Sequence, residues 1–140
     1  MSSESGRRSG SRQSRARGQG RRGEEGEDAA CRFLESVGFS ILARNVRFRG
    51  GEIDIVAREG GTTVFVEVKE RGGDSHGAAF EAVTAAKRRR VIRAAIMYAS
   101  ARGLYDAPLR FDVVSVTWSA VDPGSPKVRH DRDAFDATGR

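Results

Sequence analysis

A chain of 140 residues with 38% hydrophobic content has the usual size of one domain built around one modest core. Its single cysteine, Cys31, excludes an internal disulfide framework and a cysteine-rich zinc site, and fits a reducing cytoplasm. No run approaches the roughly 18 apolar residues of a membrane span, and no apolar segment follows the basic N-terminus as in an export signal. We therefore expect a soluble, cytoplasmic protein with no membrane partner.

The formal charge of +6 belongs to the first 22 residues. Seven arginines and one glutamate lie in residues 1–22, whereas basic and acidic residues balance in the rest of the chain. After Met1 this segment contains only Gly, Ser, Arg, Gln, Ala and Glu, so it lacks the apolar groups that offset the entropy of ordering. We expect a disordered basic tail, which either binds phosphate through counterion release or serves as a solubilising leader.

The first expected element is a helix from about Gly23 to Gly38. Four acids supply the negative first turn that a helix dipole favours, apolar residues follow at helical spacing, and Gly38 supplies the stop. The four acids are Glu24, Glu25, Glu27 and Asp28. Residues 39–48 are rich in strand formers, although their alternation is interrupted at residues 43–45.

Two stronger strands follow, at residues 53–57 and 62–69, and Gly60-Gly61 between them is a candidate two-residue hairpin turn. A second helix is expected from Thr84, as N-cap, to Arg102. Residues 109–118 form a last strong strand. Residues 121–140 read as a polar extension that could hold a short edge strand. This order predicts an α/β or α+β domain with a mixed sheet over residues 23–120.

The expected hairpin brings two acidic motifs together. If Gly60-Gly61 is the turn, Asp54 faces Glu67 and Glu52 faces Lys69 across the two strands. The alternation of side chains places these four residues on one face of the sheet. The opposite face then carries four apolar residues, which are Ile53, Ile55, Val66 and Val68.

Facing carboxylates indicate a cation site. With β-carbons about 5 Å apart, Asp54 and Glu67 would repel each other unless a cation or a proton lay between them. Magnesium held there could polarise a phosphate and lower the pKa of a bound water, and Lys69 could orient that water or stabilise charge on the phosphorane. The alternative is a solvated sheet face with Glu–Lys pairs, although the apolar run at residues 64–66 favours a covered face or a cleft.

These motifs resemble the YraN family of uncharacterised bacterial proteins, which is described as endonuclease-like and similar to Holliday-junction resolvases of the PD-(D/E)XK superfamily. The resemblance runs from about residue 23 to residue 118. The segments that carry it are Gly26–Ala30, Arg44-Asn45, Gly51–Ala57, Val64–Lys69, Lys87 and Arg110–Val114.

The resemblance implies a restriction-endonuclease-like core, in which helices flank a mixed sheet in the order helix, three strands, helix, strand. It assigns metal binding to Asp54 and Glu67, catalysis to these two carboxylates with Lys69, and completion of the metal site to Glu27. The implied cofactor is magnesium or manganese, and the implied partner is DNA. The proline that gives the superfamily its name is absent, because Ile53 precedes Asp54. A homodimer is compatible with the resemblance, although no stretch of the sequence identifies a dimer face.

Other candidates have both a functional and a structural interpretation. Glu27 could simply stabilise a helix N-terminus, and Glu52 could support the site or pair with Lys69. A basic cluster opens the second long helix, where it could contact backbone phosphates or form a solvated face. Its members expected to bind nucleic acid are Lys87, Arg88 and Arg90. Asp112 is expected to form structural hydrogen bonds, and neither His76 nor His130, which reads as part of a tail, is assigned catalysis.

The leading hypothesis is a metal-dependent DNA endonuclease acting on branched or structured DNA. The alternative is a non-catalytic nucleic-acid-binding module that keeps the nuclease scaffold, with affinity supplied by the arginine tail and the second helix. A third, weaker hypothesis is a protein-interaction subunit whose acidic face binds a basic partner.

Overall fold

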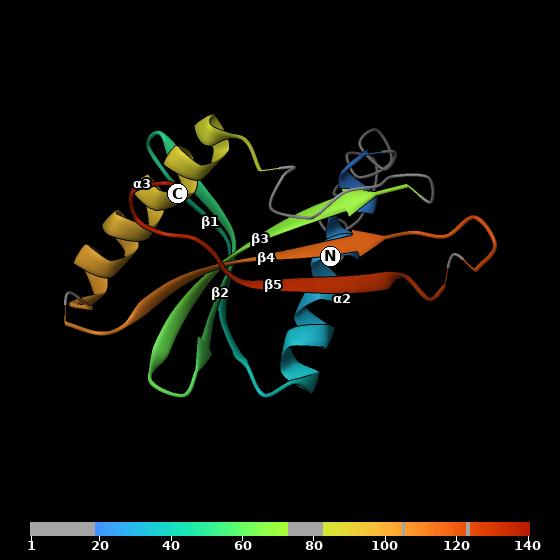
Figure 1. Cartoon of the computed structure of the whole chain (residues 1–140), viewed down its shortest axis with the longest axis horizontal. Coiled ribbons are helices and arrows are strands. Elements are labelled where there is room, and N and C mark those ends of the chain that lie inside the picture. The colour runs from blue at the N-terminus through green and yellow to red at the C-terminus, as the bar shows by residue number, and fades with distance from the viewer. Residues whose placement is uncertain (1–18, 73–82, 105, 123) are drawn as a thin grey trace, which may run out of the picture.

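The computed structural model describes residues 19–72, 83–104, 106–122 and 124–140 as one five-stranded sheet with two helices (Figure 1). Strands follow one another across the sheet in sequence order; β3 and β4 are parallel, and the other neighbours are antiparallel. This α+β arrangement is the expected one and is consistent with a restriction-endonuclease-like core. In chain order the elements are α2 (Gln19–Ser36), β1 (Ser40–Phe48), β2 (Gly51–Glu59), β3 (Thr62–Arg71), α3 (Ala85–Arg102), β4 (Leu109–Thr117) and β5 (Lys127–Phe135).

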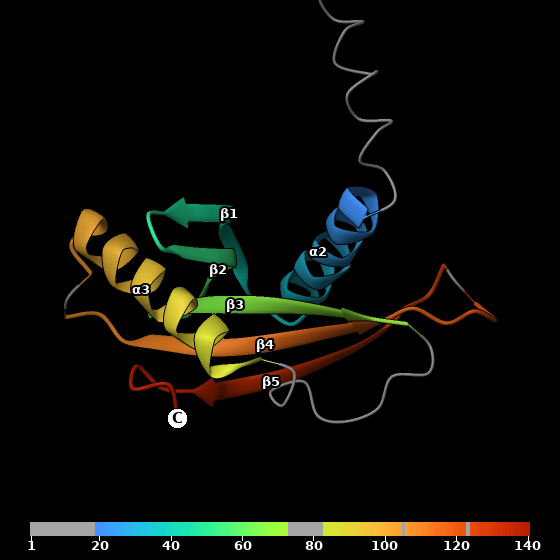
Figure 2. The same ribbon diagram turned by 90° about the horizontal axis from the view of Figure 1, so that it is seen from above.

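The two helices cover opposite faces of the sheet, and Figures 1 and 2 show them separated along it. Tyr98 of α3 meets Phe65 of β3 edge-on, with 5.9 Å between ring centroids. On the other face, Leu34 of α2 belongs to a core cluster that includes Val66 and Val114. Because both faces are buried, the central strands are apolar on both sides. No helix in the described ranges is long and apolar enough to cross a membrane.

Helix α2 begins earlier than the sequence pattern indicated. It starts at Gln19 instead of Gly23, so the four acids at residues 24–28 do not form a first turn, and that expectation is wrong. Arginine and glutamine are good helix formers, which allows the helix to extend beyond its apolar stretch. The expected disorder of residues 1–22 lies mostly outside the described residues, but residues 19–22 are helical.

Helix α3 has the expected ends. The Thr84 hydroxyl accepts a hydrogen bond from the Lys87 amide at 3.1 Å, which is the geometry of an N-cap. Gly103 adopts the left-handed conformation, with φ 67°, and its amide donates to carbonyls of the last turn. These caps fix where α3 begins, and therefore where its basic residues lie relative to β2 and β3.

The β2–β3 hairpin has the predicted register, but its ladder stops short of the acidic residues. Pairs run from Glu59 with Thr62 to Ile55 with Val66. Beyond that point the Asp54 carboxylate accepts a hydrogen bond from the Val68 amide at 2.8 Å. The expected backbone pairing of Asp54 with Glu67 and of Glu52 with Lys69 is therefore wrong. The Asp54 carboxylate occupies the position of the next backbone hydrogen bond in the ladder.

The alternation of β2 also changes at Asp54. Ile55 lies in the core beneath α2, whereas Ile53 lies in the core beneath α3, so the expected shared face of these two residues is wrong. The change faces Asn45 of β1, which adopts a left-handed backbone conformation with φ 52°. Asparagine tolerates this conformation better than most residues, and such departures concentrate at functional sites.

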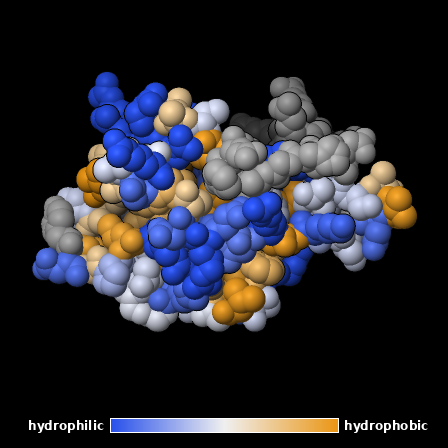
Figure 3. Space-filling model, viewed as in Figure 1, coloured by the Kyte–Doolittle hydropathy of each residue, from blue (hydrophilic) through white to orange (hydrophobic). Residues whose placement is uncertain are grey.

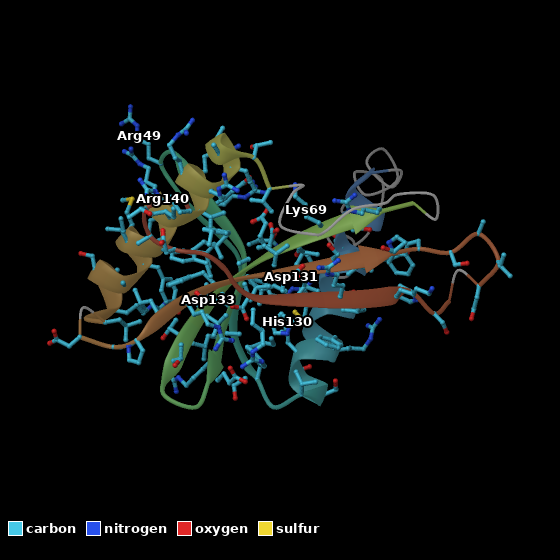
Figure 4. All side chains as sticks on the ribbon, viewed as in Figure 1. Arg49, Lys69, His130, Asp131, Asp133 and Arg140 are labelled. Atoms are coloured by element: carbon cyan, nitrogen blue, oxygen red, sulfur yellow. The ribbon has the colours of Figure 1, made fainter. Side chains whose placement is uncertain are left out.

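Strand β5 is the edge strand next to β4, and it contains His130 (Figure 4). The expectation that His130 lies in a tail is wrong, because its side chain is 8% exposed and contacts Asp112 at 2.7 Å. Phe33 of α2 and Phe39 approach the imidazole ring edge-on. The imidazole thus ties β5 to β4 and to the α2 face.

Asp112 has the structural role expected from the sequence. Its fully buried carboxylate accepts hydrogen bonds from Arg110 Nε and Nη2, at 2.8 and 2.9 Å, and from the Asp133 amide at 3.0 Å. Burial alone would raise the pKa of Asp112, but these bonds and His130 outweigh it and hold the pKa at about 2. Arg110 also binds Glu59 at 2.9 Å, which links β4 to the tip of the hairpin.

The turn between β1 and β2 packs tightly against α3, beneath a hydrophilic surface (Figure 3). A β-carbon on Gly51 would lie 2.7 Å from the Arg90 carbonyl oxygen and 2.8 Å from the Ala94 nitrogen. Both atoms belong to helix backbone and cannot move aside. Only glycine at position 51 allows the turn to approach the helix this closely.

We expect Gly51→Ala to lower the free energy of unfolding by about 1–3 kcal/mol, since the turn must move away from α3. Urea denaturation measures the change. Gly61→Ala is the matched control, because a β-carbon there meets no atom within 4 Å. Equal stability of the two variants would show that the turn is not held against the helix.

Candidate active site

Four elements meet around the acidic residues of the β2–β3 hairpin. Asp54 lies on β2, and Glu67 and Lys69 lie on β3, where they point to the α3 side of the sheet. Helix α2 contributes Glu27, and helix α3 contributes Lys87. The site thus combines residues that are 60 positions apart in the sequence, from 27 to 87.

Glu67 is the buried centre of the site. Only 3% of its side chain is exposed, and its buried Oε2 atom has no hydrogen-bond partner in the part of the chain that the structure describes. Burial, followed by the nearby charge of Asp54, raises the pKa of Glu67 to about 8. The two carboxylates therefore do not both ionise at neutral pH unless a cation compensates them. This like-charge pair was predicted from the hairpin arithmetic, and the structure brings it together.

Glu27 lies at the edge of the same acidic group. Burial and the charge of Asp54 raise the pKa of Glu27, which places it within electrostatic reach of the pair. Its Oε1 atom accepts hydrogen bonds from Asn45 Nδ2 at 3.0 Å and from Arg44 Nη2 at 3.4 Å. Because Glu27 is not in the first turn of α2, its interpretation as a helix-end acid is wrong.

Asn45 and Arg44 orient Glu27, a role that the residue patterns did not assign to them. Arg44 Nη1 also binds Asp28 at 2.8 Å, so one guanidinium holds two acids of α2 against β1. The available signal was the interrupted alternation of residues 43–45. That interruption marks the left-handed Asn45 and the departure of β1 from regular pairing.

Lys87 is placed between two carboxylates. Its Nζ atom lies 2.7 Å from Glu52 Oε1 and 3.3 Å from Glu67 Oε1. Burial alone would lower the pKa of Lys87, but Glu52 and Glu67 together raise it. Arg90 Nη2 adds a second cation at 3.3 Å from Glu52. Glu52 therefore binds two basic residues of α3. The expected pairing of Glu52 with Lys69 is replaced by its pairing with Lys87.

The other predicted basic residues occupy different environments. Lys69 lies on β3 with its side chain half-buried (Figure 4), and it forms no ion pair with another residue in the described part of the chain. Arg88 is half-buried and donates to the Val83 carbonyl at 3.0 Å, which ties it to the chain before α3. Arg90 is 55% exposed. His76, to which the sequence assigned no catalytic role, lies outside the described residues.

The chain was compared with known proteins. A family model described as "Uncharacterised protein family UPF0102" matches residues 26–116. The chain belongs to this family. The expected YraN family is thereby confirmed, since the two names denote the same family.

Similar UPF0102 proteins occur in several bacteria. One from Symbiobacterium thermophilum is 56% identical over 94 residues, covering 67% of this chain and 80% of that protein. One from Geobacter sulfurreducens is 43% identical over 114 residues, covering 81% and 88%. One from Anaeromyxobacter dehalogenans is 45% identical over 118 residues, covering 84% and 86%. Their names state the family and no activity, so function must be argued from the site.

The acidic group of this UPF0102 protein fits a divalent cation at Asp54 and Glu67. The unpartnered, buried Oε2 of Glu67 beside a second carboxylate is a hard oxygen donor with no protein cation on it. Across residues 19–72, 83–104, 106–122 and 124–140, no three acidic, histidine or cysteine side chains are arranged to hold a metal. Magnesium commonly takes one or two carboxylates together with substrate oxygens, so two protein ligands suffice.

Proposed function

We propose that this UPF0102 protein is a metal-dependent DNA endonuclease that acts on branched or structured DNA. The observation that carries the proposal is the closeness of Asp54 to the buried Glu67, whose Oε2 atom has no hydrogen-bond partner among the described residues. A protein gains no stability from such a pair. Perturbed carboxylates of this kind concentrate at functional sites.

Asp54 and Glu67 would hold magnesium or manganese, and Glu27 is a further carboxylate within electrostatic reach of Asp54. A bound divalent ion supplies Lewis-acid polarisation of a phosphate and a lower pKa for coordinated water. The Val68 amide keeps the Asp54 carboxylate oriented into the site. Glu52 binds both Lys87 and Arg90, and so holds Lys87 beside Glu67.

The reaction proposed for this site is hydrolysis of a phosphodiester. A water oxygen forms a bond to phosphorus, one ester P–O bond breaks, and the leaving oxygen takes up a proton. Lys69 follows Glu67 by two residues on the same face of β3 and has no carboxylate partner among the described residues. Its ammonium is therefore available to orient the water or to stabilise negative charge on the phosphate.

The proposal is tested by incubating the full chain with a panel of single-stranded, duplex and branched DNA in magnesium or manganese. We expect cleavage of branched or single-stranded DNA that EDTA abolishes. Lys69→Ala is expected to lower the rate by roughly 10²-fold or more, the loss seen when one stabilising group is removed from a developing charge. Absence of cleavage across the panel with both metals would contradict the proposal.

A second candidate function is favoured by the lack of a three-ligand group in the described ranges. In that case the chain is a nucleic-acid-binding module that retains the nuclease scaffold without catalysis. Salt-sensitive DNA binding that survives EDTA and Asp54→Asn, in the absence of cleavage, would identify this module.

A further inference from the structure

We propose that the β1–β2 turn and the first half of α3 form an arginine surface that binds the phosphate backbone of DNA beside the acidic site. The inference rests on the proposed function for its choice of polyanion, but binding does not require cleavage. All five side chains of the arginine surface are exposed. They are Arg47 and Arg49 from the turn region, and Arg89, Arg90 and Arg93 from α3.

The arginine surface is held on a rigid frame. Gly50 and Gly51 allow the turn to contact α3, and no side chain fits at position 51. Arg93 Nε donates to the Arg49 carbonyl at 3.1 Å, which joins the two elements directly. Residues from two separate segments are thereby fixed next to each other, as Figure 2 shows for the turn and the helix. A fixed arrangement of guanidinium groups loses little entropy when it binds phosphates.

The charges of the arginine surface are largely uncompensated. Some other arginines of the described chain are matched with acids, as Arg110 and Arg132 are with Glu59. By contrast, Arg49, Arg89 and Arg93 form no ion pair with any described residue. Among the described residues, the acid that forms an ion pair with this surface is Glu52, which binds both Lys87 and Arg90.

The arginine surface continues into the acidic site. Arg47 pairs with Glu52 in the register of β1 and β2, and Arg90 contacts the same carboxylate. Glu52 in turn shares Lys87 with the buried Glu67. The arginine surface is thus connected to the acidic site through Glu52 and Lys87. Guanidinium groups bind phosphate oxygens in pairs, which suits a phosphodiester backbone.

The test is fluorescence anisotropy of labelled duplex DNA with the full chain in EDTA, at several salt concentrations. The variant Arg49→Ala/Arg89→Ala removes two guanidinium groups that form no hydrogen bond or ion pair with any described residue, so its fold is expected to persist. We expect its affinity to fall about 5- to 20-fold, and the slope of log affinity against log salt to decrease by about 2.

The matched control is Arg58→Ala/Arg102→Ala, which removes the same net charge from the far ends of β2 and α3. Its affinity is expected to stay within about twofold of the wild type at moderate salt. Equal weakening of DNA binding in both variants, or no DNA binding by the wild type, would overturn the proposal that the arginine surface binds DNA. DNA binding that depends on Arg49 and Arg89, in the absence of any cleavage, would support DNA binding by the arginine surface and contradict only the proposed endonuclease activity.

Discussion

The Asp54→Asn variant is expected to lose roughly 10²–10³-fold or more of the metal-dependent cleavage rate without losing stability. The amide removes the negative charge that a divalent ion needs, but its oxygen can still accept the hydrogen bond from the Val68 amide. Asparagine also relieves the repulsion that raises the pKa of Glu27 and Glu67. Loss of activity with equal or greater stability is the usual signature of a residue kept for function.

Glu59→Gln is the control for Asp54→Asn, since it changes another carboxylate of β2. Glu59 forms ion pairs with Arg110 and Arg132 at the opposite end of the strand. We expect this variant to be less stable than the wild type and to retain cleavage. Asp54→Asn should therefore lower the cleavage rate but not the melting temperature, whereas Glu59→Gln should lower the melting temperature but not the cleavage rate. Wild-type cleavage by Asp54→Asn would show that the acidic pair is not the site.

The second large effect is expected in the pH dependence of stability, where Glu67→Gln should stabilise the protein at alkaline pH. The pKa of Glu67 is about 8 in the folded state, against an ordinary value of 4.5. Below about pH 4.5 both states carry the proton, and between these values the folded state holds a proton that the unfolded state has lost. The free energy of unfolding therefore falls as pH rises from about 4.5 to about 8, by on the order of 5 kcal/mol.

Glutamine cannot ionise, so the Glu67→Gln variant should lack most of this fall. Urea denaturation in EDTA at pH 5, 7 and 9 measures the difference, which should be small at pH 5 and largest at pH 9. Magnesium added at pH 9 should stabilise the wild type more than the variant, because a ligand that binds only the folded state raises its stability. Parallel pH profiles for the two proteins would contradict the raised pKa of the buried Glu67.

Local features of the fold could be predicted from the sequence because neighbouring residues determine them. Thr84 and Gly103 bracket α3 through their own hydrogen-bonding and backbone preferences. The Gly60-Gly61 turn fixes the register of β2 and β3, and this register brings Asp54 near Glu67. The closeness of Asp54 and Glu67 could therefore be predicted from the register of a single hairpin.

Other features depend on contacts between distant segments, which no local pattern encodes. The position of Lys87 between Glu52 and Glu67 follows from the docking of α3 onto the β1–β2 turn. The burial of His130 follows from the buried Asp112 on the neighbouring strand. In both cases the charged partner lies on a different element of the fold.

The central claim is that Asp54 and Glu67 together hold a divalent cation. Anomalous diffraction from manganese-soaked crystals tests it most directly, since the signal locates the ion without any assumption about activity. We predict an anomalous peak between the two carboxylates, within bonding distance of the Glu67 oxygen that lacks a hydrogen-bond partner. An empty site at saturating manganese, with Lys87 still on Glu67, would contradict the claim.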